Sequence, residues 1–183
     1  MAKINTTDLV CKSTIYLTPS SILDPVRQYF GGVIPLDPAT EPSNPTKATW
    51  FGTKKGSNSA QDLGNGLAVQ WSLYDGTFIN PPYGKEIRLF CRRICEEAAL
   101  GAEIIALLPA GARFSTRYFQ DYIFNPHLEA AAFIRGRVKF LRPDGTVAGQ
   151  NPYDSVLYGF NVDVDKFTQC FAPLGKVMMI TVL

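Results

Sequence analysis

The sequence predicts one α/β domain with a mixed central sheet, and three observations carry this prediction. Ile104–Leu108 is a continuous apolar run, which is typical of a strand buried on both faces. Between Lys85 and Leu100 the apolar residues recur at helical spacing, and Gly101 ends the pattern. After Pro126 the pattern changes to short strands separated by turns. Helices and strands that alternate and then give way to strands predict a sheet whose C-terminal strands are antiparallel.

The segments before this region predict one helix, one strand and a long loop. Thr18 suits a helix cap and Pro19 suits a first helical turn, so a helix is expected over about 21–30. The apolar run 33–36 predicts a buried strand. Residues 37–66 are rich in proline, glycine and small polar residues, which predicts a loop whose part around 50–66 is flexible.

The remaining elements follow from the same patterns, and together they make residues 1–183 a single domain. They are a strand over 77–79, a helix over about 115–124, strands over 130–134, 137–141, 155–160 and 176–182, and a short helix over 167–171.

Composition excludes several classes of protein. The 183 residues are 46% hydrophobic and 19% charged, which is ordinary for a globular protein with its own core. A net charge of +2 excludes a histone-like polycation, although it leaves local clustering of basic residues open. The chain has four cysteines without a Cys-x-x-Cys pair and one histidine, His127, so no metal site is predicted. It shows neither a leader pattern nor an apolar run of 18 residues, so we expect neither secretion nor membrane spanning.

The most informative segment is Asn80-Pro81-Pro82-Tyr83, which follows a strand and precedes a helix. Open α/β sheets bind ligands at the carboxyl ends of their strands. Each proline holds φ near about −65° and favours extended geometry before it, so the carbonyl groups of Asn80 and Pro81 point in fixed directions. Acceptors beside the Tyr83 ring suit a planar heteroaromatic ring with an exocyclic amine, which donates to the Asn80 side-chain oxygen and the Pro81 carbonyl. The alternative is a proline-stiffened strand exit with a packed tyrosine.

With its neighbours, this motif makes residues 16–160 resemble the short, Dam-like phage-type DNA N6-adenine methyltransferases. In chain order, the segments that carry the resemblance are Tyr16-Leu17-Thr18-Pro19, Leu36-Asp37-Pro38-Ala39, Asn65-Gly66-Leu67-Ala68, Phe78 to Gly84, Leu107-Leu108-Pro109-Ala110, Ile134 to Phe140 and Pro152-Tyr153-Asp154-Ser155. The resemblance implies a Rossmann-like methyltransferase fold and an enzyme that transfers a methyl group from S-adenosylmethionine to N6 of a flipped adenine in DNA. It also implies a phage or prophage gene that acts in the cytoplasm of a bacterial host, with protection from restriction as a hypothesis.

The resemblance also assigns roles to residues. Asn80, Pro81, Pro82 and Tyr83 would form the catalytic motif, in which Asn80 and Pro81 hold the amine and Tyr83 stacks on the base. The implied cofactor-binding residues are Tyr16, Thr18, Pro19, Asp37, Pro38, Ala39 and Asn80.

Asp37 would face the ammonium or ribose side of the cofactor, and Thr18 and Pro19 would line its methionine end. A carboxylate at the end of an apolar strand is otherwise costly, although a turn-forming Asp-Pro is the alternative. The chain departs from the family pattern twice. It has no glycine-rich loop after the first strand, and Asn65 stands where an aspartate is expected, with Asp62 close by.

Basic residues predict where DNA would bind. Residues 109–142 contain six basic and two acidic residues, a local charge of +4. The candidate nucleic-acid-binding residues are Lys54, Lys55, Arg113, Arg117, Arg135, Arg137 and Lys139. The alternation of Arg135, Arg137 and Lys139 predicts one face of a strand that contacts phosphates. A solvated charged edge that discourages strand pairing is the alternative.

Other functions remain open from the sequence. An NH2 group is also presented by cytosine N4, by RNA bases and by a glutamine amide in a protein, so a methyltransferase with one of these acceptors is an alternative. A catalytically silent DNA-binding relative is another. The chain leaves little room for a separate recognition domain, and a homodimer would supply the further contacts that base flipping needs.

Overall fold

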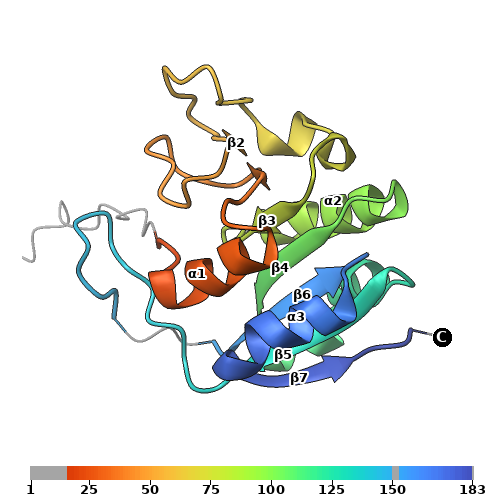
Figure 1. The fold of residues 1–183 in the computed structure, drawn as a ribbon. Coiled ribbons are helices and arrows are strands. Elements are labelled where there is room, and N and C mark those ends of the chain that lie inside the picture. The colour runs from red at the N-terminus through yellow and green to blue at the C-terminus, as the bar shows by residue number, and fades with distance from the viewer. Residues whose placement is uncertain (1–15, 150–152, 183) are drawn as a thin grey trace, which may run out of the picture.

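The computed structural model describes residues 16–149 and 153–182, within which seven strands form one sheet in the order β2-β1-β3-β4-β6-β5-β7 (Figure 1). The strands are β1 (Leu36–Asp37), β2 (Trp50–Phe51), β3 (Thr77–Ile79), β4 (Ile104–Pro109), β5 (Leu128–Ile134), β6 (Ser155–Phe160) and β7 (Gly175–Met179). Strands β2, β1, β3 and β4 pair in parallel, whereas β6 is antiparallel to β4 and β5, and β7 is antiparallel to β5. The α/β class with a mixed sheet and antiparallel C-terminal strands is therefore confirmed. Pro152, quoted above, lies outside the described residues.

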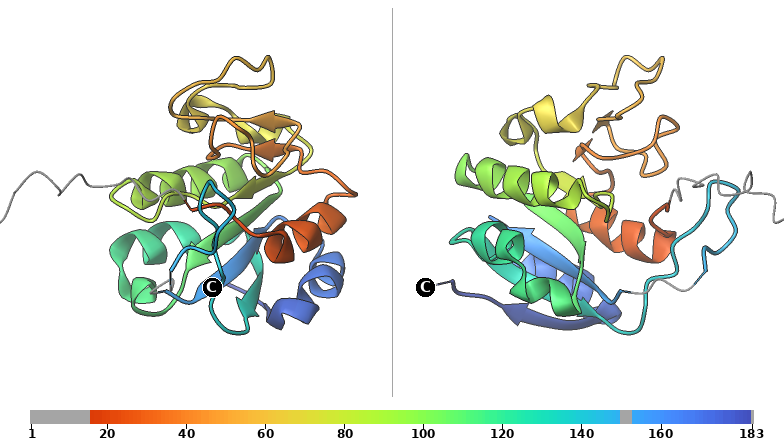
Figure 2. Two further views of the ribbon diagram at one scale, coloured as in Figure 1. Left: turned by 90° about the vertical axis from the view of Figure 1, so that its left-hand side faces the viewer. Right: turned by 180° about the vertical axis from the view of Figure 1, so that it is seen from behind.

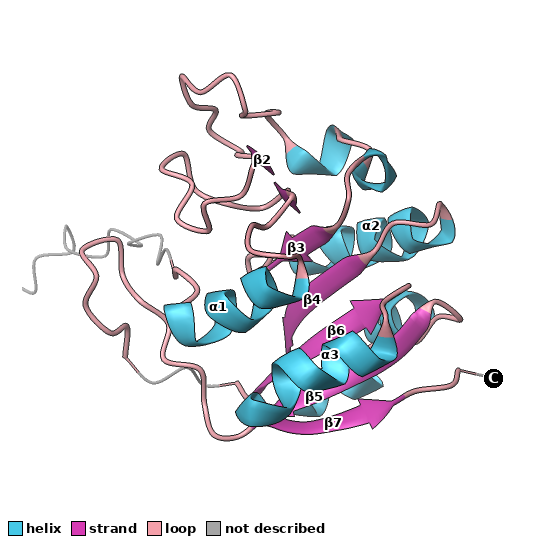
Figure 3. Cartoon of the chain, in the orientation of Figure 1, coloured by secondary structure: helices cyan, strands magenta, loops and turns pink. Residues whose placement is uncertain are grey.

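Helices cover both faces of this sheet (Figure 2 and Figure 3). Helices α1 (Ser20–Tyr29) and α3 (Val164–Phe171) pack on one face, and α2 (Ile87–Ala99) and the π-helical turn η5 (Phe119–Ile123) pack on the other. The other short helices are η2 (Gly66–Ala68), η3 (Trp71–Leu73), η4 (Gly111–Ser115) and η6 (Ala172–Leu174). In the described part of the chain, no helix is long and apolar enough to cross a membrane.

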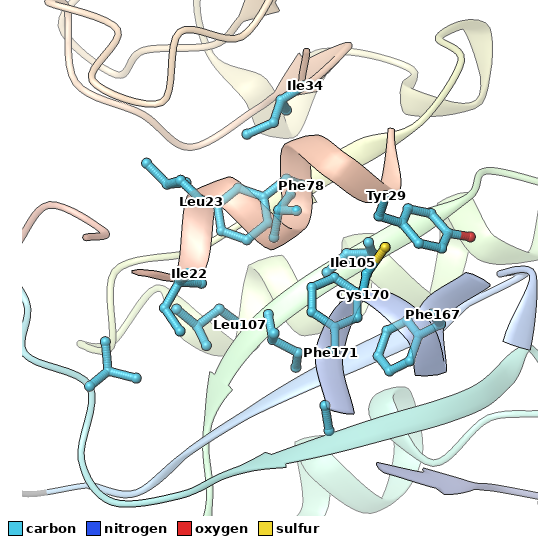
Figure 4. Close-up of a cluster of buried hydrophobic side chains, with 14 of the residues drawn as sticks. Ile22, Leu23, Tyr29, Ile34, Phe78, Ile105, Leu107, Phe167, Cys170 and Phe171 are labelled. Atoms are coloured by element: carbon cyan, nitrogen blue, oxygen red, sulfur yellow. The ribbon is translucent and has the colours of Figure 1, made fainter. Parts of the chain in front are cut away.

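Strand β4 lies between two hydrophobic cores, and all six of its residues are buried. Ile105 and Leu107 belong to the core under α1 and α3, which includes Phe78 and Phe171 (Figure 4). The alternate residues, such as Ala106, belong to the core under α2. Because successive side chains of a strand point to opposite faces, a strand covered on both faces is apolar at every position. This explains the continuous apolar run seen in the sequence.

The expected strand over 33–36 is wrong in extent. The strand is reduced to Leu36–Asp37, and the Val33 side chain is 47% exposed. Pro35 has no N–H group to donate to a sheet ladder, which shortens the strand. Thr18 was expected to cap helix α1, but the cap residue is Pro19 and no side chain caps the helix.

The expected helix over 115–124 is present in part, since the chain forms the 3₁₀ helix η4 and then the π-helical turn η5. The Thr116 hydroxyl donates to the Arg113 carbonyl (2.5 Å), and the Thr116 N–H donates to the same carbonyl (2.9 Å). These two hydrogen bonds end the 3₁₀ helix η4 before the π-helical turn η5 begins.

The segment over 137–141 was expected to be a strand and is instead an extended segment outside the sheet. Gly136, with φ of 74°, turns the chain away after β5. Among the described residues, this segment pairs through Leu141 alone, in isolated bridges to Leu17 and Val147. The predicted alternation of side chains is nevertheless present, since Val138 and Phe140 are buried whereas Arg137 and Lys139 are exposed.

The predicted loop over 37–66 contains the short strand β2, which the sequence did not reveal. Phe51 of β2 donates its N–H to the Gln61 carbonyl (3.1 Å) and accepts from the Leu63 N–H (2.8 Å), so the two ends of the 50–66 segment are joined. Gly66 then packs so closely on Pro38 that an added Cβ would lie 1.7 Å from the Pro38 carbonyl oxygen. Glycine at this position lets the segment approach the turn after β1. The flexibility of this segment and the single-domain assignment stay predictions.

Candidate active site

The candidate site lies at one edge of the sheet, where several strand ends meet. Because β1, β3 and β4 are parallel, Asp37, Asn80 and the residues after Pro109 lie at the same edge. Strand β6 runs the opposite way and begins at this edge, with Ser155 paired to Pro109. The turns after β1, β3 and β4 and the segment before β6 are therefore neighbours. This is the edge at which open α/β sheets bind ligands.

The Asn80 side chain is held in one orientation by the N-terminal segment. Its Nδ2 donates to the Thr18 hydroxyl oxygen at 3.0 Å, and Thr18 is buried. This bond identifies Nδ2 as the donor side of the amide and leaves Oδ1 as its acceptor side. Pro81 is buried and Pro82 is exposed, and helix α2 does not begin until Ile87. The carbonyl groups of this turn thus precede the helix, as the sequence predicted.

Tyr83 is half-buried and its ring is braced by two other rings. The Phe140 ring lies 6.3 Å away at 89°, and the Tyr153 ring lies 6.4 Å away at 69°. The Tyr83 hydroxyl reaches the Leu107 carbonyl only at 3.5 Å, which is a long and weak hydrogen bond. Burial raises the pKa of Tyr83 well above its ordinary value, so the hydroxyl stays protonated. The hydroxyl is therefore held inside the protein in its neutral form.

The predicted cofactor residues near the N-terminus are brought to the same place by a second contact. Leu17 and Leu141 exchange backbone hydrogen bonds of 2.8 and 2.9 Å. The Tyr16 ring then lies 6.3 Å from the Phe140 ring, which in turn contacts Tyr83. Tyr16 is 53% exposed and remains accessible to a ligand. Residues 16–19 and 137–141 thus flank the Asn80–Tyr83 turn together.

Asp37 is almost fully buried, and its own loop satisfies its carboxylate. Oδ1 accepts from the Ala39 N–H (3.0 Å), which is a local turn contact, and Oδ2 accepts from the Thr46 hydroxyl (2.8 Å). Burial raises the pKa of Asp37 to about 6, although the hydrogen bonds from residues 39, 46 and 40 partly oppose this. The turn-forming interpretation of Asp37 is therefore present in the structure. The carboxylate nevertheless remains costly to ionise.

We expect Asp37→Asn to stabilise the protein at neutral pH. The folded-state pKa lies above the unfolded value, so the contribution of Asp37 to stability falls as pH rises from about 4 to about 6. At pH 7.5 the amide would remove a cost of up to about 3 kcal/mol, since one pKa unit corresponds to about 1.4 kcal/mol. Its NH2 can donate to Thr46, whose hydroxyl can donate to Asn44 Oδ1 at 3.3 Å.

Urea unfolding of both proteins at pH 4 and pH 7.5 measures this difference. We expect the variant to be more stable at pH 7.5 and the gap to close at pH 4, where the wild-type carboxyl is protonated. A variant that is less stable than wild type at pH 7.5 would show that charge-assisted bonds to the Asp37 carboxylate outweigh its burial.

The family position at which an aspartate was expected is filled by a residue with a structural task. The Asn65 side chain caps η2 by accepting from the Leu67 N–H (3.2 Å). The nearby Asp62 accepts from the Gly64 N–H (2.9 Å) and the Thr53 hydroxyl (2.9 Å). Both side chains thus organise the 50–66 segment.

The predicted DNA-binding residues divide into two groups. Arg113 is at the site, because its guanidinium lies 5.1 Å from the centre of the Tyr153 ring and bonds the hydroxyl groups of Tyr153 (3.3 Å) and Tyr118 (3.4 Å). Lys54 forms an ion pair with Glu86, just before α2, so the 50–66 segment reaches the turn after Tyr83.

The other predicted basic residues are exposed. Arg117 pairs with Asp121 (3.2 Å), and Arg137 lies 3.8 Å from Asp154. The remaining exposed ones are Lys55, Arg135 and Lys139. Because residues 137–141 are not a strand, the prediction of one basic strand face is wrong. No cluster of three or more potential metal ligands occurs within the described residues.

Sequence reasoning assigned no role to several residues that the structure places at the site. Phe140 and Tyr153 brace Tyr83, and Tyr118 contacts Arg113. The alternation of apolar and basic residues over 137–141 marked Phe140 as inward-facing. No local pattern linked it to Tyr83, because the contact depends on where the segment crosses the sheet edge.

Comparison with known proteins supplies the family. The model of the family described as DNA N-6-adenine-methyltransferase (Dam) matches residues 5–161, which include the strand ends that form the candidate site. No curated protein is significantly similar to the chain. The matched segment spans most of the sequence and contains Asp37, the Asn80–Tyr83 turn and Arg113. The chain belongs to the DNA N-6-adenine-methyltransferase (Dam) family.

Proposed function

We propose that this protein transfers a methyl group from S-adenosylmethionine to N6 of an adenine that has been flipped out of duplex DNA. The observation that carries the proposal is the fixed Asn80 amide. Its donor side is bonded to Thr18 (3.0 Å), so its acceptor side is oriented before any ligand binds. An oriented acceptor beside an aromatic ring, at the ligand-binding edge of the sheet, matches the needs of an amino group on a planar base.

The residues around Asn80 fit the proposed cofactor. Asp37 is a buried carboxylate without a cationic partner among the described residues, and the cofactor carries an ammonium group and a sulfonium group. A cation near this carboxylate would lower its pKa and remove the cost of ionising it. Tyr16, Thr18, Pro19, Pro38 and Ala39 line the same edge and complete the proposed cofactor set. Bound S-adenosylmethionine would supply an electrophilic methyl group.

The chemistry that this chain contributes is hydrogen bonding and positioning. Asn80 Oδ1 accepts one N–H of the adenine amine, and the Pro81 carbonyl accepts the other. Accepting both hydrogens draws electron density to N6 and favours a pyramidal, more nucleophilic amine. Neither the Asn80 oxygen nor the Pro81 carbonyl is a strong base, so neither keeps the proton that N6 loses. That proton passes through these acceptors to water. Fixed dipoles of this kind act without reorganising during the reaction.

Tyr83 supplies the stacking surface, and its two variants separate ring from hydroxyl. We expect Tyr83→Phe to retain activity close to wild type, because the hydroxyl contacts only the protein interior, the Leu107 carbonyl at 3.5 Å and the Ser155 side chain. Tyr83→Ala should weaken productive DNA binding by about 1–3 kcal/mol, the usual value of one base–aromatic stack. KM and kcat for a DNA substrate measure this. Equal losses of DNA binding in Tyr83→Phe and Tyr83→Ala would contradict a stacking role for the Tyr83 ring.

The function itself is tested by incubating the protein with S-adenosylmethionine and mixed-sequence duplex DNA, digesting the DNA to nucleosides and separating them by mass. N6-methyladenine supports the proposal. N4-methylcytosine, or methylation of RNA or of a protein glutamine amide instead, would replace it with one of those acceptors. DNA binding without cofactor binding by calorimetry would indicate a catalytically silent relative.

DNA is the proposed partner, and the basic residues near the site are its proposed contacts. A homodimer would add contacts that hold the duplex open during flipping. An enzyme of this kind encoded by a phage or prophage would act in the cytoplasm of the bacterial host.

A further inference from the structure

A cavity of about 340 Å³ lies directly beside the Asn80–Tyr83 turn, and half of its lining residues are basic. It is lined by Gly84, Lys85, Ile87, Arg88, Arg113 and Tyr118. Three of these six residues are cations and none is an acid. One of the lining residues, Gly84, directly follows Tyr83 in the chain. The cavity thus adjoins the proposed base-stacking ring.

The three cations are not neutralised by carboxylates of the described chain. Lys85 and Arg88 are exposed and take part in none of the ion pairs formed by the described residues. Arg113 is oriented by the neutral hydroxyl groups of Tyr118 and Tyr153. The nearest acid in sequence, Glu86, is paired with Lys54. The cavity therefore has a positive potential that an anion would satisfy.

The helix beside the cavity adds to this potential. Helix α2 has 13 residues, no side chain caps its N-terminus, and its first turn contains no acidic residue. The N-terminal end of a helix carries a partial positive charge, and the carboxylate of its N-cap residue here, Glu86, is paired with Lys54. Two cavity residues, Ile87 and Arg88, are the first two residues of this helix.

Charge also separates this cavity from the proposed cofactor site. The acidic group, Asp37, ends β1, Asn80 directly follows β3, and Arg113 lies in η4 after β4. Strand β3 lies between β1 and β4 in the sheet. The cofactor carries a sulfonium cation and would be repelled by three basic side chains. A polyanion would be attracted by them. Along the sheet edge, the Asp37 carboxylate is thus followed by the Asn80 amide and then by the basic side chains of the cavity.

We propose that the cavity lined by Lys85, Arg88 and Arg113 binds a backbone phosphate of DNA next to the flipped nucleotide. This inference rests on the proposed function for the identity of the polyanion. Phosphate contacts fix the register of DNA without reading its sequence. A DNA backbone that is bound at this cavity would place the flipped base between the Tyr83 ring and the Asn80 amide.

Salt dependence of DNA binding tests the site. Fluorescence anisotropy of a labelled duplex gives Kd over a range of KCl concentrations for wild type, Lys85→Ala, Arg88→Ala and the double variant. Each lost phosphate contact should reduce the magnitude of the slope of log Kd against log salt by about 0.9. The matched control is Arg92→Ala on the same helix, which is exposed and paired with Glu96 (2.7 Å), and its slope should equal that of wild type.

S-adenosylmethionine affinity, measured by calorimetry, should be the same in all these proteins. Slopes for the Lys85 and Arg88 variants equal to that of the Arg92 variant would overturn the inference, as would a wild type that binds no DNA. If the wild type binds DNA but forms no methylated base, the proposed function fails while the slopes still decide the inference.

A modified duplex locates the phosphate. The two phosphates flanking the methylated adenine are replaced by uncharged methylphosphonates. Wild type should bind this duplex more weakly than the unmodified one, and the double variant should bind both equally. An equal loss in wild type and the double variant would assign those phosphates to another part of the surface.

Discussion

Asn80→Ala is expected to lower kcat for DNA methylation by about 100- to 1,000-fold, the usual effect of removing one preorganised hydrogen-bonding group from an active site. The substitution deletes the proposed acceptor of one amine N–H, so the amine stays conjugated with the ring and weakly nucleophilic. It also deletes the 3.0 Å bond to Thr18, whose loss should cost only about 1 kcal/mol of stability.

The rate is measured at saturating S-adenosylmethionine and DNA, because Asn80 is also assigned to the cofactor set. Asn80→Asp is the matched control. It keeps an acceptor oxygen, and Thr18 can then donate its hydroxyl instead of accepting, so we expect this variant to retain measurable activity. A kcat for Asn80→Ala within tenfold of wild type would contradict the proposed role of the amide oxygen.

Glu97→Ala is expected to destabilise the protein by about 3 kcal/mol, the lower end of the usual cost of removing one partner of a buried ion pair, because its partner Arg93 is 23% exposed. The Glu97 side chain is fully buried on α2. Oε1 lies 2.5 Å from the Arg93 guanidinium, and Oε2 accepts from the Ser72 N–H at 2.9 Å. Arg93 also donates to the Val69 carbonyl (2.6 Å). One carboxylate thus attaches the segment 69–72 to α2.

Glu96→Ala is the control for this prediction. Glu96 lies one residue earlier, its side chain is 41% exposed, and it pairs with Arg92 and, at 3.6 Å, with Arg93. Exposed pairs contribute about 0–1 kcal/mol, so this variant should stay close to wild type. Urea unfolding followed by circular dichroism measures both. Similar losses of stability in the two variants would show that the Glu97 pair stabilises the protein no more than the exposed Glu96 pairs do.

The Glu97 pair also connects stability with the site. The segment 69–72 follows η2, whose Gly66 packs on Pro38 directly after Asp37. A loosened η2 would therefore free the turn that carries part of the proposed cofactor set. We expect Glu97→Ala to weaken S-adenosylmethionine binding as well as stability, whereas Glu96→Ala should leave both unchanged.

The sequence by itself determined the fold class and the position of the central motif. A strand covered on both faces is apolar throughout, so the run at 104–108 was unambiguous. Two prolines between a strand and a helix restrict the backbone locally, so the turn at Asn80–Tyr83 was also predictable. These features depend on short-range sterics and on burial, which a local pattern records.

Only the tertiary structure decided which distant residues meet at this turn. Thr18 looks like a helix cap in the sequence but orients Asn80, which lies 62 residues away. Phe140 alternates like a strand residue, yet its backbone leaves the sheet and its ring braces Tyr83. Lys85 and Arg88 share a cavity with Arg113 because η4 follows the strand beside their own turn. Such contacts depend on strand order and on loop paths, which follow from packing of the whole chain rather than from any local pattern.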